Sequence, residues 1–352
     1  MSQTPPGRKA PTRNDVAARA QVSTAVVSYV MTGSKRVTPE KERRVRQAMA
    51  DLGYRPNSSA RALRTGKTYV LALLLPDSSN PYFAEVALKI ERAAAAEGYA
   101  LLIANTHDDP AQELRLLREM RSRGVDGVIL ASVFHDTWPG DAREIPLVLI
   151  DAFHPVEGVP SVGVDAAASA RAAVEHLAEV HGRRSIALVL GASADPAGNV
   201  DPRQVGWADA LADTGAASGG IAVTSWSRAG GIAAAQQLLT GPDRPDAVFA
   251  GSDLLGVGVL RAAADRGLRV PEDLSVISYD GTEEAAFSIP RLTTLSQPTD
   301  DVARAAIAAI LAPSAAAGRH VVLPGELVIR ESCGCVTPPS RVDARRAERN
   351  TE

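Results

Sequence analysis

Residues 12–67 read TRNDVAARAQVSTAVVSYVMTGSKRVTPEKERRVRQAMADLGYRPNSSARALRTGK, and this stretch decides how the chain is organised. From the N-terminus to residue 67 there are fourteen Lys/Arg and four Asp/Glu, whereas the rest of the chain holds 24 and 37. The overall net charge of −3 hides this division. A short basic head on an acidic body indicates a polyanionic partner for the head alone.

Three short helices are predicted within the head. Thr12 or Asn14 can cap the first helix, and Ser23 can cap a second over residues 24–31. A third helix starts with a proline at its first position and runs over residues 39–52. Two short helices joined by a three-residue turn are typical of a helix-turn-helix, whose second helix enters the major groove of DNA. A three-helix bundle without a DNA partner is the alternative, and the local positive charge favours DNA binding.

The second helix of the head offers several candidates for contacts with DNA bases. The side chains expected on its exposed face are Thr24, Ala25, Ser28 and Tyr29. The three valines of this helix cannot all be exposed, so some of them must pack it onto its neighbours.

Residues 57–66, NSSARALRTG, are basic and compatible with a helix but lack a full apolar face. Their single large apolar residue, Leu63, suits a wedge that opens a base step from the minor groove and kinks the duplex. A helix this short is marginal alone in water. We therefore expect it to form when paired with a second copy on DNA.

The body has a different texture, in which continuous apolar runs alternate with amphipathic helices. Runs of this kind are typical of parallel strands buried on both faces, and the alternation predicts a doubly wound α/β architecture. About 260 residues are many for one open sheet, so two sheets with a cleft between them are expected. The predicted strands are residues 69–76, 99–104, 127–131, 147–151, 161–165, 186–191, 221–226, 247–253 and 274–280.

Composition excludes several classes of protein. No apolar run approaches the roughly 20 residues that span a bilayer, and the N-terminus has no apolar signal region, so we expect a cytoplasmic protein without a membrane partner. The two cysteines, Cys333 and Cys335, are read as structural or incidental. The six histidines show no ligand spacing, and His176 and His181 are read as ordinary helix-end residues. We therefore expect neither a metal nor a cofactor.

Polar residues at strand ends indicate ligand binding rather than catalysis, because the chain contains no GxSxG elbow, HExxH or Walker loop. Asp253 and Asp280 end two predicted strands, where doubly wound folds bind ligands, although both could instead cap the following helices. Trp226 ends another strand and could stack on a sugar or a base, or simply pack. The further candidates at helix starts are Tyr82, Phe83 and Arg203.

The chain resembles the LacI/GalR family of bacterial transcription regulators over about residues 12–333. The head matches in NDVAARAQVS, VSYVMTG, RVTPEKERRVRQAMADLGYRPN and ARALRTGK. The body matches in PDSSNPYFAEV, GYALLIANT, RSRGVDGVIL, VPSVGVD, AVEHL, GLRVPEDLSVISYDG, LTTLSQP and LVIRESC. Each stretch is weak alone, but together, and in the family's order, they are highly specific.

The resemblance implies roles in DNA binding. Bases in the major groove would be read by Thr24, Ala25 and Tyr29, and the hinge helix would carry Asn57, Ala60 and Leu63, with Leu63 entering the minor groove of a palindromic operator. Tyr29 stands where the family usually has Arg, and Val26 where it usually has Thr. A phenol cannot read guanine as a guanidinium does, so an unusual half-site is expected.

The resemblance also implies an effector pocket in a body like the periplasmic binding proteins, with no catalytic residues. The matching positions are Tyr82, Phe83, Arg203, Trp226, Ser252, Asp253 and Asp280. This mixture favours a sugar or sugar derivative, with a nucleoside or purine as the alternative. The expected partners are double-stranded, pseudo-palindromic operator DNA, the effector and a second copy of the chain. A sugar-binding transport protein and an enzyme are rival readings, which the basic head and the lack of catalytic motifs disfavour.

The expected domain boundaries follow from these assignments. They are a disordered arm at 1–11, the head at 12–56, the hinge at 57–68, the body at 69–333 and a disordered tail at 334–352. Within the body, one subdomain would comprise about 69–165 with 298–320, and the other 166–297 with 321–333.

Overall fold

The computed structural model describes residues 11–55, 66–131, 145–151, 156–192 and 200–335. Contacts divide the chain into two compact units, Met1–Thr68 and Tyr69–Glu352, which are the expected head and body. Within the described residues, no helix is both long enough and apolar enough to cross a membrane.

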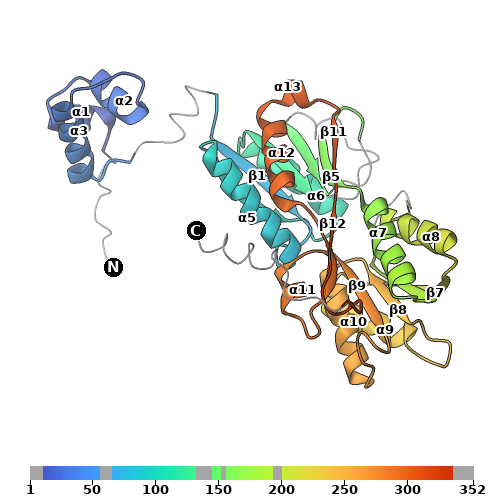
Figure 1. The fold of residues 1–352 in the computed structure, drawn as a ribbon. Coiled ribbons are helices and arrows are strands. Elements are labelled where there is room, and N and C mark those ends of the chain that lie inside the picture. The colour runs from blue at the N-terminus through green and yellow to red at the C-terminus, as the bar shows by residue number, and fades with distance from the viewer. Residues whose placement is uncertain (1–10, 56–65, 132–144, 152–155, 193–199, 336–352) are drawn as a thin grey trace, which may run out of the picture. The chain divides into compact units, whose positions relative to one another are not determined.

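The head consists of α1 (Arg13–Ala20), α2 (Thr24–Thr32) and α3 (Pro39–Leu52) (Figure 1). Thr12 caps α1 in a reciprocal capping box with Asp15, and Ser23 caps α2 by accepting a hydrogen bond from the Val26 amide. Between the two helices Arg44 of α3 donates to the carbonyls of Ala20 and Gln21, at 2.5 and 3.0 Å. This clamp fixes the turn of the predicted helix-turn-helix. The buried core comprises Val16, Ala17, Ala20, Val27, Val45 and Ala48.

The body contains two six-stranded sheets, as expected from its length. The first has the order β11-β5-β4-β3-β1-β2 and the second β12-β10-β9-β8-β6-β7. The first sheet comprises β1 (Val70–Leu75), β2 (Ala100–Asn105), β3 (Gly127–Ala131), β4 (Leu147–Ile150), β5 (Ser161–Val164) and β11 (His320–Leu323). The second comprises β6 (Ser185–Gly191), β7 (Ala217–Thr224), β8 (Ala247–Ala250), β9 (Ser275–Asp280), β10 (Thr293–Ser296) and β12 (Glu326–Val328).

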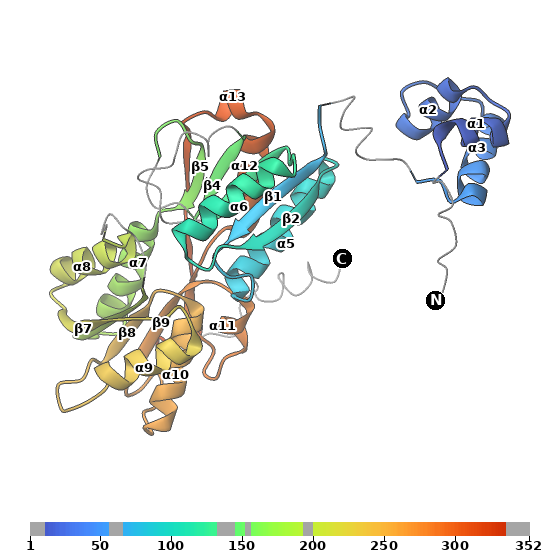
Figure 2. The same cartoon turned by 180° about the vertical axis from the view of Figure 1, so that it is seen from behind.

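Helices cover both faces of each sheet, which is why central strands such as β3 and β8 are buried and apolar throughout (Figure 2). The first sheet is packed on one face by α5 (Pro81–Ala96) and α12 (Thr299–Leu311), and on the other by α6 (Pro110–Ser122). The second is packed on one face by α7 (Ala166–Glu175) and α8 (Pro202–Thr214), and on the other by α9 (Arg228–Leu238) and α10 (Asp253–Asp265). Short helices α11 (Glu283–Phe287) and α13 (Pro313–Ala316) complete the body, together with a π-helical turn, η2 (His176–Val180), that extends α7.

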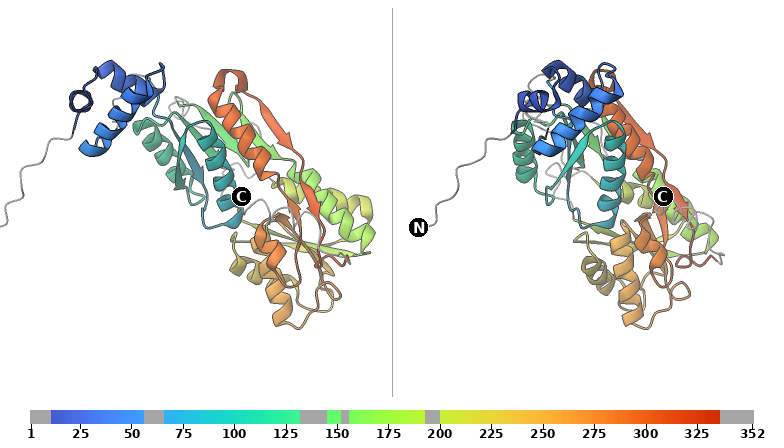
Figure 3. Two further views of the ribbon diagram at one scale, coloured as in Figure 1. Left: turned by 60° about the vertical axis from the view of Figure 1, so that its left-hand side comes forward. Right: turned by 90° about the vertical axis from the view of Figure 1, so that its left-hand side faces the viewer.

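The chain passes between the two lobes of the body more than once, and each set of strands draws on distant parts of the sequence (Figure 3). The expected boundary at residue 320 falls inside β11, which pairs in parallel with β5 in the first sheet. After β11 the chain therefore returns to the second sheet at β12, which pairs antiparallel with β10. The range 321–333 proposed for the second subdomain was thus wrong at its start, because residues 321–323 have their backbone partners in the first sheet.

Candidate effector site and DNA-binding head

Asp280, the last residue of β9, has a strained backbone and a buried carboxyl group. Its φ of 120° lies in a region that side-chain-bearing residues rarely adopt, and such strain is concentrated at functional sites. One carboxylate oxygen accepts a hydrogen bond from the Gln297 side chain at 3.1 Å, and the other accepts from the Asp253 amide at 3.4 Å. Burial raises the pKa of Asp280 well above its usual value, and the nearby carboxyl of Asp253 raises it further.

Gln297 connects the two subdomains through its side-chain amide. Its oxygen accepts a hydrogen bond from the Tyr82 hydroxyl at 3.0 Å, while its nitrogen donates to Asp280. Tyr82 is in the first turn of α5, where the Asn80 side chain caps the helix by accepting from the Tyr82 amide. The bonded series Tyr82–Gln297–Asp280 therefore joins a helix of the first subdomain to a strand end of the second.

Arg203 is held in the first turn of α8 by a carboxylate and two aromatic rings. Its guanidinium donates to both carboxylate oxygens of Asp201, at 2.9 and 2.7 Å, and to the Gly251 carbonyl at 2.9 Å. Its central carbon lies 4.8 Å from the ring centroid of Trp226 and 5.4 Å from that of Tyr279. The side chain is 8% exposed. A charge fixed in this way is oriented before any ligand arrives, which lowers the cost of binding.

Trp226 lies two residues beyond β7, and its indole packs against the end of β6. A Cβ atom on Gly191 would come within 2.0 Å of the ring, so only glycine leaves room for this contact. Because Arg203 already lies over the ring, Trp226 has a visible role in positioning the guanidinium. Stacking on a ligand stays a prediction for this residue.

Ser252 and Asp253 are engaged by the protein itself. Ser252, rather than Asp253, caps α10 by accepting from the Leu255 amide at 3.2 Å. The Asp253 carboxylate is 1% exposed and accepts four hydrogen bonds. Its donors are the Ser278 hydroxyl (2.5 Å), the Thr294 hydroxyl (2.6 Å) and both the amide and hydroxyl of Thr282 (2.6 and 2.7 Å). Four donors use the acceptor capacity of a carboxylate, so we propose that Asp253 positions the Asp280 strand instead of touching ligand.

Asp151 was not among the sequence candidates, although it follows β4 and belongs to the group. Like Asp280, it has a positive φ, of 55°. Burial raises its pKa to about 6, against the opposing effects of the Arg203 charge and the Tyr82 hydroxyl. The strand-end rule that singled out Asp253 and Asp280 applies equally to the Asp that closes LVLID. Asp201, Tyr279 and Gln297 carry no comparable signal, because their roles depend on partners distant in sequence.

Phe83 follows Tyr82 in α5, and the two ring centroids lie 5.1 Å apart. Hydrogen bonds join Tyr82, Gln297 and Asp280, and ring contacts join Phe83 to Tyr82 and Trp226 to Arg203. The Arg203 charge acts on the carboxyl groups of Asp151 and Asp280.

In the head, the predicted reading residues lie on α2 with different exposures. Thr24 and Ala25 are exposed, whereas Ser28 and Tyr29 are half-buried. Val27 is fully buried, which confirms that the valines of α2 help to pack the head. The Lys35 ammonium lies 5.3 Å from the centroid of the Tyr29 ring, so the atypical aromatic residue carries a cation beside it. The hinge candidates Asn57, Ala60 and Leu63 lie outside the described residues.

Four residues from distant parts of the sequence come together in the second subdomain. The two histidines were read as ordinary helix-end residues and the two cysteines as structural or incidental, but the ligand atoms of His176, His181, Cys333 and Cys335 lie within 4.8 Å of one another. Spacing along the sequence did not show this, because the two pairs are more than 150 residues apart and meet only in the fold.

Comparisons with known proteins agree with the fold and with the head. A family model described as "Bacterial regulatory proteins, lacI family" matches residues 12–57, and one for a periplasmic binding protein-like domain matches residues 174–333. The chain is 34% identical over 305 residues to catabolite control protein A of Priestia megaterium, covering 83% of this chain and 89% of that protein. It is also 34% identical over 296 residues to the ribose operon repressor of Halalkalibacterium halodurans, covering 83% and 86%.

Two solved structures extend the likeness over nearly the whole chain. The Lac repressor dimer bound to operator and the anti-inducer ONPF has a TM-score of 0.81 at 25% identity, covering 92% of this chain and 99% of that one. The complex of the transcriptional regulator CelR with cellobiose has a TM-score of 0.67 at 30% identity, with the same coverage. The chain is therefore a member of the LacI family of DNA-binding transcriptional regulators.

Proposed function

We propose that this chain is a repressor whose affinity for its operator is controlled by a sugar or sugar derivative bound between the two subdomains. The observation that carries the proposal is the bonded series Tyr82–Gln297–Asp280, with Arg203 and Asp151 beside it. A sugar offers many hydroxyl groups, each able to donate and to accept, and carboxylates with a fixed guanidinium satisfy both. The solved CelR–cellobiose complex supports a sugar for a related chain.

The proposed mechanism couples this site to the head. Two heads of a homodimer read inverted half-sites with Thr24, Ala25, Ser28 and Tyr29, and paired hinges bring both Leu63 side chains to the operator centre. A ligand that binds one arrangement of the subdomains more tightly than the other shifts the population toward it. Because Gln297 bonds residues of both subdomains, such a rearrangement changes this contact.

A second copy of the chain is supported by apolar surface on the body. Leu102 and Ile103 of the edge strand β2 are 43% and 49% exposed, and Leu88 of α5 is 44% exposed. Phe287, the last residue of α11, and Ile289, two residues later, are 79% and 95% exposed. Exposed large apolar side chains on an edge strand are a liability that a dimer contact removes.

The test begins with an operator selected from random duplexes by the full chain, followed by a panel of sugars and nucleosides screened for their effect on operator affinity. We expect a sugar to change the affinity, whereas a response to nucleosides alone would contradict the effector class. The sugar is then recovered after incubation with the chain and identified chemically. Unchanged sugar is expected, and recovery of a reaction product would contradict a purely regulatory role.

Arg203→Ala is the matched variant for this test. It removes the buried charge that Asp201 and two rings hold in place, so the ligand response is expected to disappear while operator affinity without ligand is retained. Arg261→Ala is the control, because that arginine is 68% exposed and pairs with Asp265 along its own helix. A normal ligand response in Arg203→Ala would show that the site is misassigned.

A further inference from the structure

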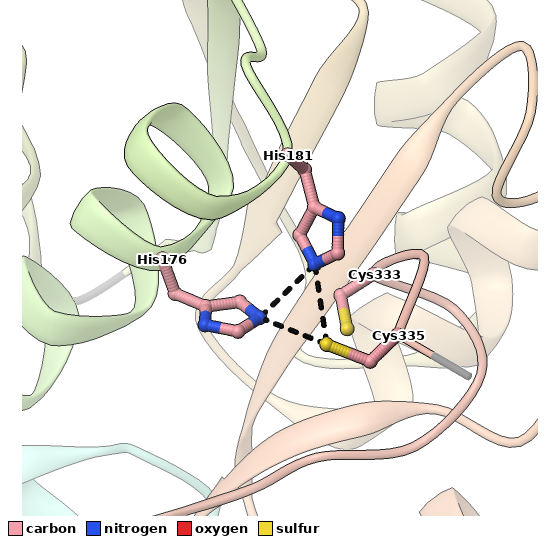
Figure 4. A group of neighbouring side chains, drawn as sticks. All are labelled: His176, His181, Cys333 and Cys335. Carbon is pink, nitrogen blue, oxygen red and sulfur yellow. Dashed lines mark hydrogen bonds between the residues drawn. The ribbon is translucent and has the colours of Figure 1, made fainter. Parts of the chain in front are cut away.

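The histidine–cysteine cluster joins two segments of the second subdomain. His176 begins the π-helical turn η2, His181 follows that turn, and the two cysteines belong to the CGC that follows β12. A π-helical turn closes hydrogen bonds over five residues, so residues five apart are brought to one side of the chain. Figure 4 shows both imidazoles pointing toward the Cys335 sulfur. Their Nε2 atoms are 3.1 Å apart.

The distances within the cluster match those of a tetrahedral metal centre. The Cys335 sulfur lies 3.6 Å from His176 Nε2 and 3.4 Å from His181 Nε2. Tetrahedral zinc, with bonds of about 2.0–2.1 Å to nitrogen and about 2.3 Å to sulfur, separates two nitrogens by about 3.4 Å and a nitrogen from a sulfur by about 3.6 Å. All four ligand atoms lie within 4.8 Å of one another. A movement of the Cys333 side chain by about 1 Å therefore brings its sulfur to the ligand separations of a tetrahedral zinc site.

Two polar groups lie at the Cys333 sulfur, and one of them, the Arg330 carbonyl at 3.7 Å, accepts from the thiol that metal binding would deprotonate. Cys333 is fully buried, and its sulfur accepts a hydrogen bond from the Thr293 hydroxyl at 3.2 Å. The same hydroxyl oxygen accepts the Arg330 amide at 2.9 Å, which leaves its proton for the sulfur. Donors of this kind orient and stabilise ligating thiolates.

Gly334 allows the CGC to approach the histidines. Its φ is 114°, and a Cβ at this position would lie 3.0 Å from His181 Nδ1. A side chain here would strain the backbone and press on the imidazole, so glycine between the cysteines is required by the geometry.

We propose that His176, His181, Cys333 and Cys335 form a closed structural site for a zinc ion. Two thiolates and two neutral imidazoles balance the charge of a divalent cation, so the half-buried centre carries no net charge. A tetrahedral set of two nitrogens and two sulfurs favours zinc, whereas magnesium and calcium require oxygen ligands. Four protein ligands leave no open position, so the ion ties the C-terminal CGC to the end of α7 rather than reacting.

The test uses the full-length chain, stripped with a chelator under reducing conditions and then given zinc or cobalt(II). Metal content after gel filtration is expected to be one ion per chain, and cobalt(II) is expected to give the visible bands of tetrahedral coordination together with thiolate charge transfer. Failure to retain zinc at this ratio, or a cobalt spectrum of six-coordinate type, would overturn the proposal without any variant.

Variants then assign the ligands. His181→Asn and Cys335→Ser are expected to lose the tetrahedral cobalt spectrum, whereas His107→Asn is expected to keep it. His107 is a suitable control because its φ of 58° is one that asparagine tolerates, and it lies in the other subdomain. An unchanged cobalt spectrum in both ligand variants, or loss of the spectrum in His107→Asn alone, would place the metal elsewhere.

Discussion

At the scale of single residues, the proposed effector site depends on side chains whose partners are fixed by the fold. Arg203 is bracketed by Asp201 and two rings, and Gln297 accepts from one subdomain while donating to the other. Arg203 and Asp280 could be named as candidates from the sequence, because strand ends and helix starts are recognisable in the chain. Gln297 could not be named in this way, because that residue gains its role only when the segment after β10 meets α5.

Asp253 provides a prediction about stability. Asp253→Ala leaves the buried hydroxyls of Ser278 and Thr294 without their acceptor, and the free energy of unfolding is expected to fall by about 3 kcal/mol. Asp300→Ala is the control, since that carboxylate is 66% exposed in an ion pair with Lys89 and its loss is expected to cost less than about 0.5 kcal/mol. Urea unfolding of the two variants compares these values, and equal losses would contradict the structural role of Asp253.

Asp151 provides a prediction about pH. Because burial raises its folded pKa to about 6 from 3.8, the folded chain binds more protons than the unfolded chain between these values. Stability of the wild type is therefore expected to fall, relative to Asp151→Asn, as pH rises from about 4 to about 6, by up to about 2–3 kcal/mol. Parallel denaturation curves at several pH values measure this difference, and identical pH dependence in both proteins would refute the shift.

At the scale of elements, the sequence was informative where periodicity is strong. The capped helices of the head and the apolar strands of both sheets were predicted close to their observed positions. By contrast, β10 was missed because TTLS has no apolar run, and α9 was missed because RAGGIAAAQQL contains two glycines in its first turns. Residues 321–323 of β11 were assigned to the wrong subdomain. Their pairing with β5 is a tertiary contact that no local sequence pattern encodes.

The hinge provides a prediction at this scale, based on sequence. Leu63→Ala is expected to lower the affinity for the selected operator by at least about tenfold, or about 1.4 kcal/mol, because the wedge that stabilises the kinked duplex is removed. Binding to a random duplex at the same salt concentration is the control and is expected to change little, since it depends on the basic residues of the head. Equal losses on both duplexes would show that Leu63 acts on folding or charge instead of on the operator.

At the scale of the whole molecule, the division of charge seen in the sequence corresponds to two units with separate tasks. The head holds a clamped helix-turn-helix with the basic residues, and the acidic body holds the proposed effector site at the strand ends of two sheets. Family membership fixes the class of function, whereas the identity of the effector depends on a few side chains around Arg203 and Asp280.

One ligand, bound by the body, is expected to change how tightly the head holds DNA. The most direct test measures the affinity of the sugar for the free chain and for the chain bound to its selected operator. The affinity of the chain for the operator is measured with and without the sugar. Because coupling between two sites is reciprocal, the account predicts that both pairs of measurements change by the same factor. A sugar affinity that is identical for the free and the operator-bound chain would contradict it.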